Sequence, residues 1–232
     1  MSMPTALAVV IPARDEEELL PACLDSVTGA VEALASAFPE IACRVFVVLD
    51  CCQDDSSRAV ALRPDVTGVA VQAGCVGAAR AFGVEAAARW ASSPVSGGLW
   101  VANTDADSTV PTSWLVQQVG FAAAGHDLVV GTVQPVAGDL TAYELAQWQA
   151  RHSLIDGHDH VHGANLGFSL AAYRSVGGFR AIPVHEDVEL VVALRRAGVA
   201  WVAPGNLSVI TSGQRIARAP DGFADYLDGL GA

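Results

Sequence analysis

The sequence contains no lysine, and all 13 of its basic residues are arginine, against 25 aspartate and glutamate residues. The formal net charge is therefore 13 − 25 = −12 with histidine neutral. General nucleic-acid binding needs a basic patch that neutralises phosphates, and attachment to an anionic membrane needs a polybasic stretch. Because this chain has neither, we expect no nucleic-acid partner and no electrostatic attachment to a membrane.

Long apolar runs are also missing, since none approaches the roughly 18–20 residues that span a bilayer. The apolar first ten residues lack a basic n-region and are followed at once by Pro12-Ala13-Arg14, which argues against a secretory signal peptide. The five cysteines are an odd number without a CxxC pair, a pattern that favours buried thiols over a disulfide framework or a zinc site. We therefore expect a cytoplasmic protein without a transmembrane segment.

Short apolar runs followed by polar or glycine-rich turns recur along the first half of the chain. They cover residues 6–11, 45–49, 66–71 and 99–102, and helical patterns follow most of them. The composition, 52% hydrophobic and 16% charged, excludes intrinsic disorder. The alternation predicts an α/β fold with a mainly parallel central sheet and helices on both faces.

The pattern also predicts individual elements. We expect Asp15 to cap a first helix with apolar residues spaced by about 3.6 positions. Helices are expected near residues 112–124 and 139–152, and a single strand near 127–134. A helix beginning at His185-Glu186-Asp187 and a short terminal helix at about 221–229 complete the prediction.

Polar residues follow the ends of the predicted strands, where open parallel sheets bind their ligands. Asp105 and Asp107 alternate in an extended segment, so both carboxylates can face one point and hold Mg²⁺ or Mn²⁺. The alternative is a solvated turn or a helix cap. Asp50 is either an acceptor for a base ring or a turn residue, and Glu16 is either a ligand or a favourable charge near a helix start.

Three further groups have two interpretations each. The segment Gly74–Arg80 enters a helix, so its amides can face an anion, although its spacing matches no standard phosphate loop. Glu186-Asp187 is either a helix-start pair or the source of a general base. Arg215 and Arg218 are either diphosphate clamps or a solvated basic face. For His158, His160 and His162 we favour a mobile loop lining a pocket over a zinc site.

Six motifs in order together resemble a family 2 glycosyltransferase with the GT-A fold, over roughly residues 6–200. They are Val10-Ile-Pro-Ala-Arg-Asp-Glu-Glu17, Val48-Leu-Asp50 with Asp54-Asp55, Gly77-Ala-Ala-Arg80, Asp105-Ala-Asp107, Gly163-Ala-Asn165, and Glu186-Asp187 with Leu190 and Arg195. The resemblance implies one domain over residues 1–232, with a nucleotide-binding half (1–110) and an acceptor-binding half (111–232).

The resemblance also implies roles for individual residues. Asp107, with Asp105, would hold Mn²⁺ or Mg²⁺ at the donor diphosphate, and Asp187 would deprotonate the acceptor hydroxyl, which inverts the sugar carbon. We expect the nucleotide-sugar donor to contact Pro12, Ala13, Arg14, Glu16, Asp50, Gly77, Arg80, Asp105, Ala106, Arg215 and Arg218. We expect the acceptor to contact Gly163, Ala164, Asn165, His185 and Glu186.

Departures from the family pattern refine the prediction. Cys51-Cys52-Gln53 replaces the usual second aspartate and Gly-Ser after Asp50, and no histidine follows residue 185 to serve as a late metal ligand. The Gln-x-x-Arg-Trp signature of processive synthases is absent, so we expect a non-processive enzyme with a soluble acceptor, or one presented at a membrane by another protein. The alternatives are a sugar nucleotidyltransferase, disfavoured because no glycine-rich loop follows the first strand, and a non-catalytic nucleotide-sugar-binding module.

Overall fold

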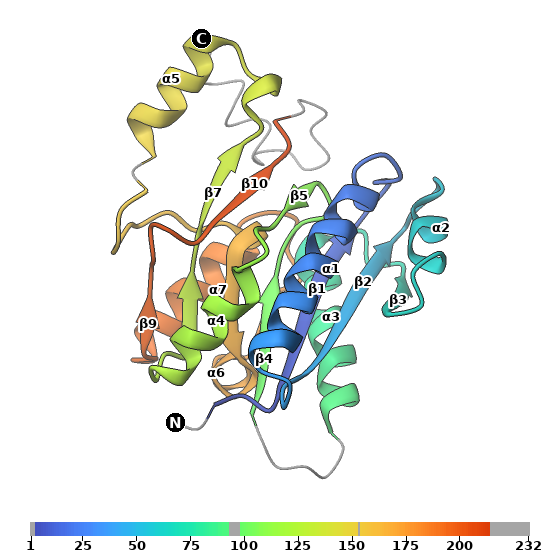
Figure 1. Cartoon of the computed structure of the whole chain (residues 1–232), viewed down its shortest axis with the longest axis vertical. Coiled ribbons are helices and arrows are strands. Elements are labelled where there is room, and N and C mark those ends of the chain that lie inside the picture. The colour runs from blue at the N-terminus through green and yellow to red at the C-terminus, as the bar shows by residue number, and fades with distance from the viewer. Residues whose placement is uncertain (1–2, 93–97, 153, 214–232) are drawn as a thin grey trace.

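A seven-stranded sheet forms the centre of the protein, in a computed structural model that describes residues 3–92, 98–152 and 154–213 (Figure 1). The strand order is β3-β2-β1-β4-β8-β6-β9, and β8 alone runs antiparallel to its neighbours β4 and β6. The sequence prediction of an α/β fold with a mainly parallel sheet is therefore confirmed. The strands are β1 (Ala6–Ala13), β2 (Ala42–Asp50), β3 (Val66–Val71), β4 (Leu99–Asn103), β6 (Leu128–Val130), β8 (Leu166–Ser169) and β9 (Trp201–Val202).

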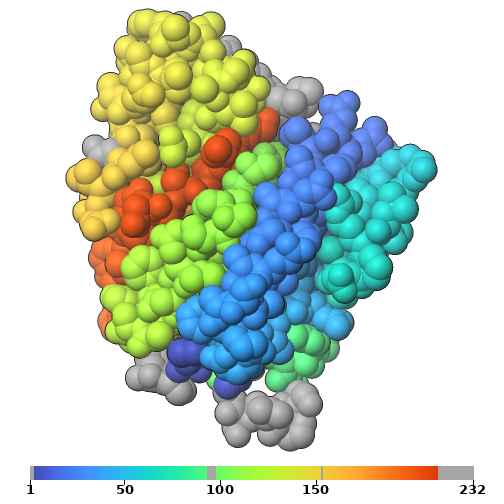
Figure 2. Space-filling model, in the orientation of Figure 1, coloured from blue at the N-terminus to red at the C-terminus, as the bar shows by residue number. Residues whose placement is uncertain are grey.

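Helices cover both faces of this sheet, because its central strands are apolar on both sides. In β1, Leu7, Val9 and Ile11 face one hydrophobic core, while Ala8 and Val10 face the other. The first core is closed by α1 (Leu20–Ala37), α2 (Ser56–Ala61) and α4 (Trp114–Ala123). The second is closed by α3 (Val76–Ala91), α6 (Leu170–Ser175) and α7 (Glu186–Arg196). Figure 2 shows α1 and α4 lying side by side on the first face.

A second, three-stranded sheet lies beyond the large one, in the order β5-β10-β7. Near it, α5 projects away from the large sheet at the top of Figure 1. The elements of this region are β5 (Ser108–Thr109), β7 (Thr132–Pro135), β10 (Ser208–Thr211), η1 (Ala137–Asp139), α5 (Ala142–Arg151) and η2 (Gly163–Asn165). Among the described residues, no helix is both long and apolar enough to cross a membrane.

Two local predictions were wrong. The single strand expected near 127–134 is divided at Gly131 into β6, which pairs in the large sheet, and β7, which pairs in the small one. A Cβ at Gly131 would lie 2.3 Å from the Asn165 side chain, so glycine permits the close contact at this break. The first helix begins at Leu20, and Asp15 does not cap it. Asp15 has a φ of 53° and its carboxylate accepts a 2.7 Å hydrogen bond from the Gln53 amide, so it ties two loops together. The terminal helix expected at 221–229 lies outside the described residues.

Candidate active site

The carboxylate of Asp50 closes the turn between β3 and α3. It is 4% exposed and accepts hydrogen bonds from the amides of Ala73 (2.7 Å), Gly74 (2.9 Å) and Cys75 (3.0 Å). Burial alone would raise its pKa, but these bonds and one from the Cys51 thiol outweigh burial and hold the pKa below its ordinary value. The anion that this turn was expected to face is thus a side chain of the protein itself. A contact between Asp50 and a base stays a prediction.

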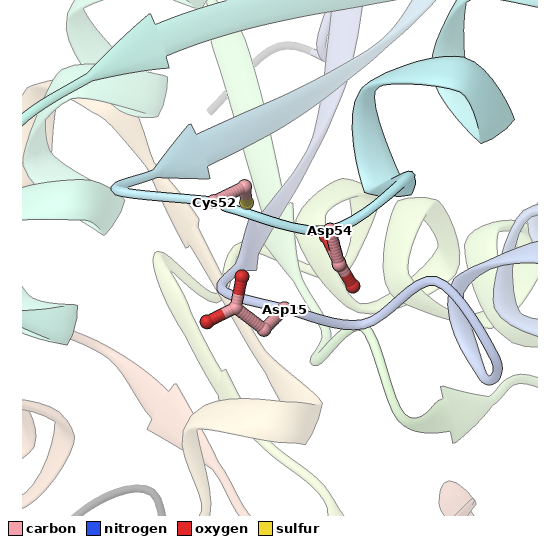
Figure 3. A group of neighbouring side chains, drawn as sticks. All are labelled: Asp15, Cys52 and Asp54. Carbon is pink, nitrogen blue, oxygen red and sulfur yellow. The ribbon is translucent and has the colours of Figure 1, made fainter.

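The loops that follow β1 and β2 lie beside each other, with Asp15 on the first and Cys52 and Asp54 on the second (Figure 3). Hydrogen bonds to backbone amides join these loops. Asp54 accepts from the amides of Glu17 (2.8 Å) and Ser56 (3.0 Å), and Glu17 accepts from Asp55 (2.8 Å). Ligand atoms of Asp15, Cys52 and Asp54 lie within 4.8 Å of one another. Both carboxylates of this group already accept amide hydrogens, so the group is explained by loop structure. Its effect is to fix the backbone beside the ends of β1 and β2.

Asp107 lies where the large sheet meets the small one. Its Oδ1 accepts hydrogen bonds from the hydroxyls of Ser108 (3.1 Å) and Thr211 (3.3 Å), and these two hydroxyls bond to each other at 2.9 Å. Burial raises the pKa of Asp107 to about 6, and the negative charge of Asp105 adds to the effect. A buried carboxylate whose negative charge lies beside a second carboxylate is suited to bind a cation.

The donor set of this segment fits a hard divalent ion. Mg²⁺ and Mn²⁺ take carboxylate oxygens, and they complete their coordination with phosphate and water. Asp105 is about one third exposed, and neither hydroxyl bond to Asp107 uses its Oδ2. Between the two aspartates, Ala106 packs into the hydrophobic core at 2% exposure and anchors the segment. Asp107 and Asp105 are therefore the residues that would hold such an ion.

Arg80 bridges the two halves of the site. Its side chain is 3% exposed, and its Nη2 donates to Oδ1 of Asp105 at 2.5 Å while its Nε donates to Oε1 of Glu186 at 2.9 Å. Burial opposes the charged form, but Asp105, Glu186 and Asp187 together keep the pKa of Arg80 above its ordinary value. The unfavourable charge at the start of α3 is thus balanced by protein carboxylates. The expected contact between Arg80 and the donor stays a prediction.

Asp187 lies at the start of α7, beside Glu186. Its two oxygens accept from the amides of Gly163 (2.6 Å) and Val188 (2.7 Å). Burial raises the pKa of Asp187, and the positive charge of Arg80 opposes this rise. A carboxylate with a raised pKa, held in place by two backbone amides, has the properties of a general base. Glu186 is more deeply buried than Asp187. Burial raises the pKa of Glu186 as well, although the positive charge of Arg80 lowers it.

Several residues expected to bind ligands instead have structural partners. Asn165 is 1% exposed; its amide donates to the carbonyls of Thr132 and Leu207 at 2.8 Å each and accepts from the Trp114 indole at 2.9 Å. All of its side-chain polar atoms are thus bonded to β7, to α4 and to the residue before β10. A Cβ at Gly77 would lie 2.1 Å from the Arg180 carbonyl oxygen, so Gly77 allows a close backbone contact.

The remaining expected residues divide by exposure. Glu16 is buried at 8%, and its amide donates to the Ser56 hydroxyl at 2.8 Å. Arg14 and His185 are exposed, and His185 has a φ of 62° at the N-cap of α7. Buried or half-buried positions are taken by Pro12, Ala13, Gly163 and Ala164. Arg215 and Arg218 lie outside the described residues.

Sequence reasoning missed the hydroxyls that orient the aspartates. Ser108 and Thr211 support Asp107, and Ser26 supports the same segment by accepting the Val110 amide at 3.1 Å. Only Ser108 is next to Asp107 in sequence. Thr211 belongs to β10, 104 positions away, so its role follows from strand pairing and has no local signal.

Four histidines and a tryptophan form a stacked cluster between the start of α5 and Gly163. His152 stacks on Trp148 at 3.4 Å between ring centroids, and His160 stacks on His152 at 4.7 Å. His158 and His162 lie 5.8 Å and 6.4 Å from His160. Burial lowers the pKa of His162 to about 3, with the neighbouring histidines adding to the effect. His162 is therefore neutral near pH 7, and it directly precedes Gly163 in the chain.

Comparison with known proteins assigns the family and the fold. Residues 8–175 match the family "Glycosyl transferase family 2", which covers more than half of the chain, and the chain belongs to that family. It is therefore a glycosyltransferase. No curated protein sequence matches it.

Solved structures similar to this chain are GT-A glycosyltransferases. Staphylococcus aureus TarS (residues 1–349) has a TM-score of 0.62 and 13% identity, over 97% of this chain and 68% of that one. The mannosyltransferase PcManGT from Pyrobaculum calidifontis, in complex with GDP-Man and Mn²⁺, has a TM-score of 0.61 and 19% identity, over 94% and 59%. Glucosyl-3-phosphoglycerate synthase from Mycobacterium tuberculosis has a TM-score of 0.57 and 18% identity, over 97% and 76%. The chain thus spans only part of each of these proteins.

Proposed function

We propose that the protein transfers a sugar from a nucleotide-diphospho-sugar to an acceptor hydroxyl, with a divalent cation, inversion at the sugar carbon and no processive movement. One observation carries the proposal: the carboxylates of Asp105, beside Asp107, and of Glu186, beside Asp187, converge on the single guanidinium of Arg80. A candidate cation site and a candidate base therefore border the same space. The PcManGT complex with GDP-Man and Mn²⁺ supports the same assignment by its similar fold.

Each residue of the site has a role in this proposal. Asp107 and Asp105 hold Mn²⁺ or Mg²⁺, and the ion supplies charge stabilisation to the diphosphate leaving group. Asp187 accepts the proton of the acceptor hydroxyl, and the amides of Gly163 and Val188 hold its carboxylate in place for that transfer. The loops that follow β1 and β2, fixed to each other by Asp15, Glu17 and Asp54, border the nucleotide.

A panel of UDP-, GDP- and dTDP-sugars, each with and without Mn²⁺, tests donor binding by the shift of the thermal midpoint. We expect the sugar nucleotides of one of the three nucleobases to raise the thermal midpoint, and only when Mn²⁺ is present. Stabilisation that is equal with and without Mn²⁺ would contradict metal dependence. Nucleoside triphosphates with sugar 1-phosphates belong in the same panel, because turnover of that pair would instead identify a sugar nucleotidyltransferase.

Asp187→Asn separates an enzyme from a binding module. The amide keeps the shape of the side chain but has no basic oxygen that takes a proton at neutral pH. We expect release of nucleoside diphosphate from the donor to fall by about 100-fold or more, in line with general-base catalysis, while donor affinity stays within threefold. If wild type and variant both bind the donor and neither releases the diphosphate, the chain is a non-catalytic nucleotide-sugar-binding module.

A further inference from the structure

Arg80 holds two carboxylates that come from opposite sides of the site. Asp105 follows β4, on the side of the candidate cation site, and Glu186 begins α7, on the side of the candidate base. The guanidinium lies between them, with hydrogen bonds of 2.5 Å and 2.9 Å. Because the guanidinium is planar and its donors are fixed relative to one another, it sets the separation of its two partners.

The same guanidinium lies against the backbone of Gly163. A Cβ added to Gly163 would lie 2.4 Å from Nη2 of Arg80 and 2.9 Å from its Cζ, so any larger residue here would displace the guanidinium. The amide of Gly163 in turn donates to Oδ2 of Asp187 at 2.6 Å. Arg80 therefore contacts Asp105 and Glu186, the second of which precedes Asp187 in the chain. It also lies against Gly163, whose amide orients Asp187.

We propose that Arg80 is a positioning residue that holds Asp187 in a fixed place relative to Asp105. The roles of Asp105 and Asp187 in this inference rest on the proposed function, but the mechanical coupling between them does not. Since the side chain of Arg80 is buried and bonded to two protein carboxylates, this role does not require a contact with the donor. A lysine would keep the charge, but its single ammonium group would lose the fixed geometry of the fork.

The Gly163 amide resonance in a ¹H–¹⁵N spectrum tests the coupling without any substrate. Asp105→Asn is expected to shift this resonance in the wild-type background and to shift it by less than half as much in the Arg80→Lys background. Arg174→Gln is the control background, because Arg174 pairs with Glu85 at 3.8 Å and both side chains are at least half exposed. In that background the shift should be the same as in wild type. An equal shift with Arg80→Lys, or no shift in wild type, would overturn the proposal.

A comparison of binding with turnover tests the consequence for catalysis. For Arg80→Lys we expect the affinity for Mn²⁺ with UDP or GDP, whichever binds wild type, to stay within threefold. The rate of diphosphate release should fall about 10- to 100-fold, since small misplacements of catalytic groups have effects of that size. A loss of affinity as large as the loss of rate would show a donor contact instead. If wild type binds neither nucleotide, the proposed function fails, and the Gly163 measurement still decides the coupling.

Discussion

The hydroxyl of Thr211 donates a 3.3 Å hydrogen bond to Oδ1 of Asp107, which joins residues 104 positions apart in the sequence. Thr211 belongs to β10, which pairs with β5 immediately after Asp107. The Ser212 amide also donates to the Asp107 carbonyl at 3.1 Å. The small sheet therefore fixes both the backbone and the carboxylate of Asp107, and this explains why a three-stranded sheet lies beside the site.

Thr211→Val should weaken Mn²⁺-dependent nucleotide binding without abolishing it. Valine keeps the shape of threonine but loses the hydroxyl, and one hydrogen bond to a charged group contributes about 1.5 kcal/mol, or roughly tenfold in affinity. Asp107→Asn should remove the metal-dependent part of binding completely. Calorimetry with UDP or GDP in the presence of Mn²⁺ measures both. Thr112→Val, at an exposed position, is the matched control and should leave the affinity unchanged.

Asp50→Asn should destabilise the protein by about 1–3 kcal/mol, the typical effect of leaving buried polar groups without partners. Asparagine offers one acceptor oxygen where aspartate offers two, and its NH₂ group would face an amide hydrogen of the turn formed by residues 73–75. Urea unfolding measures the loss. Asp65→Asn, at an exposed position, is the control. Equal stability of the two variants would show that the three amide bonds contribute little.

Two glycine-to-alanine changes in helices should have opposite signs. At Gly77 the new Cβ would lie 2.1 Å from the Arg180 carbonyl oxygen and 3.0 Å from the Glu186 side chain, so backbone must move. We expect a loss of about 1–3 kcal/mol, typical of overpacking. At Gly120, where an added Cβ meets nothing within 4 Å, alanine should gain about 0.5–1 kcal/mol through its higher helix propensity. A gain at both positions would contradict the close packing of α3 on the segment around Arg180.

The first four strands of the central sheet could be predicted from the sequence because their signals are local. Each apolar run is followed directly by its own polar turn, so the positions of Asp50 and Asp105 at strand ends can be read from neighbouring residues. The small sheet could not be predicted in this way. Its strands contain two to four residues, and what stabilises them is pairing with distant segments such as β5 with β10.

The chemistry of a polar side chain also does not reveal its partner. Asn165 stands in a family motif and has the donors and acceptors of a ligand-binding residue, but the backbone carbonyls of two other segments bind its amide. The amides after β3 are arranged as for an anion, and the anion is Asp50. In both cases the sequence correctly indicates groups that form hydrogen bonds. The partner of each group depends on contacts between segments that are distant in the sequence.

The histidine cluster should make the protein less stable in mild acid. Burial, together with His152, His160 and His158, lowers the pKa of His162 from 6.5 to about 3. Below pH 6.5 the unfolded chain therefore binds a proton at this residue that the folded chain does not bind until about pH 3, so stability falls as the pH decreases through this window. Between pH 7 and pH 5 the expected contribution of His162 is a loss of about 2 kcal/mol. Protonation of Asp107, whose pKa is raised to about 6, stabilises the folded state over the same range, so the contribution of His162 is obtained as the difference between wild type and His162→Gln. Urea unfolding at pH 7, 6 and 5 measures it, above the range in which most carboxylates titrate. His162→Gln should flatten the profile, whereas His126→Gln, outside the cluster, should keep it; an unchanged slope in His162→Gln would contradict the assignment.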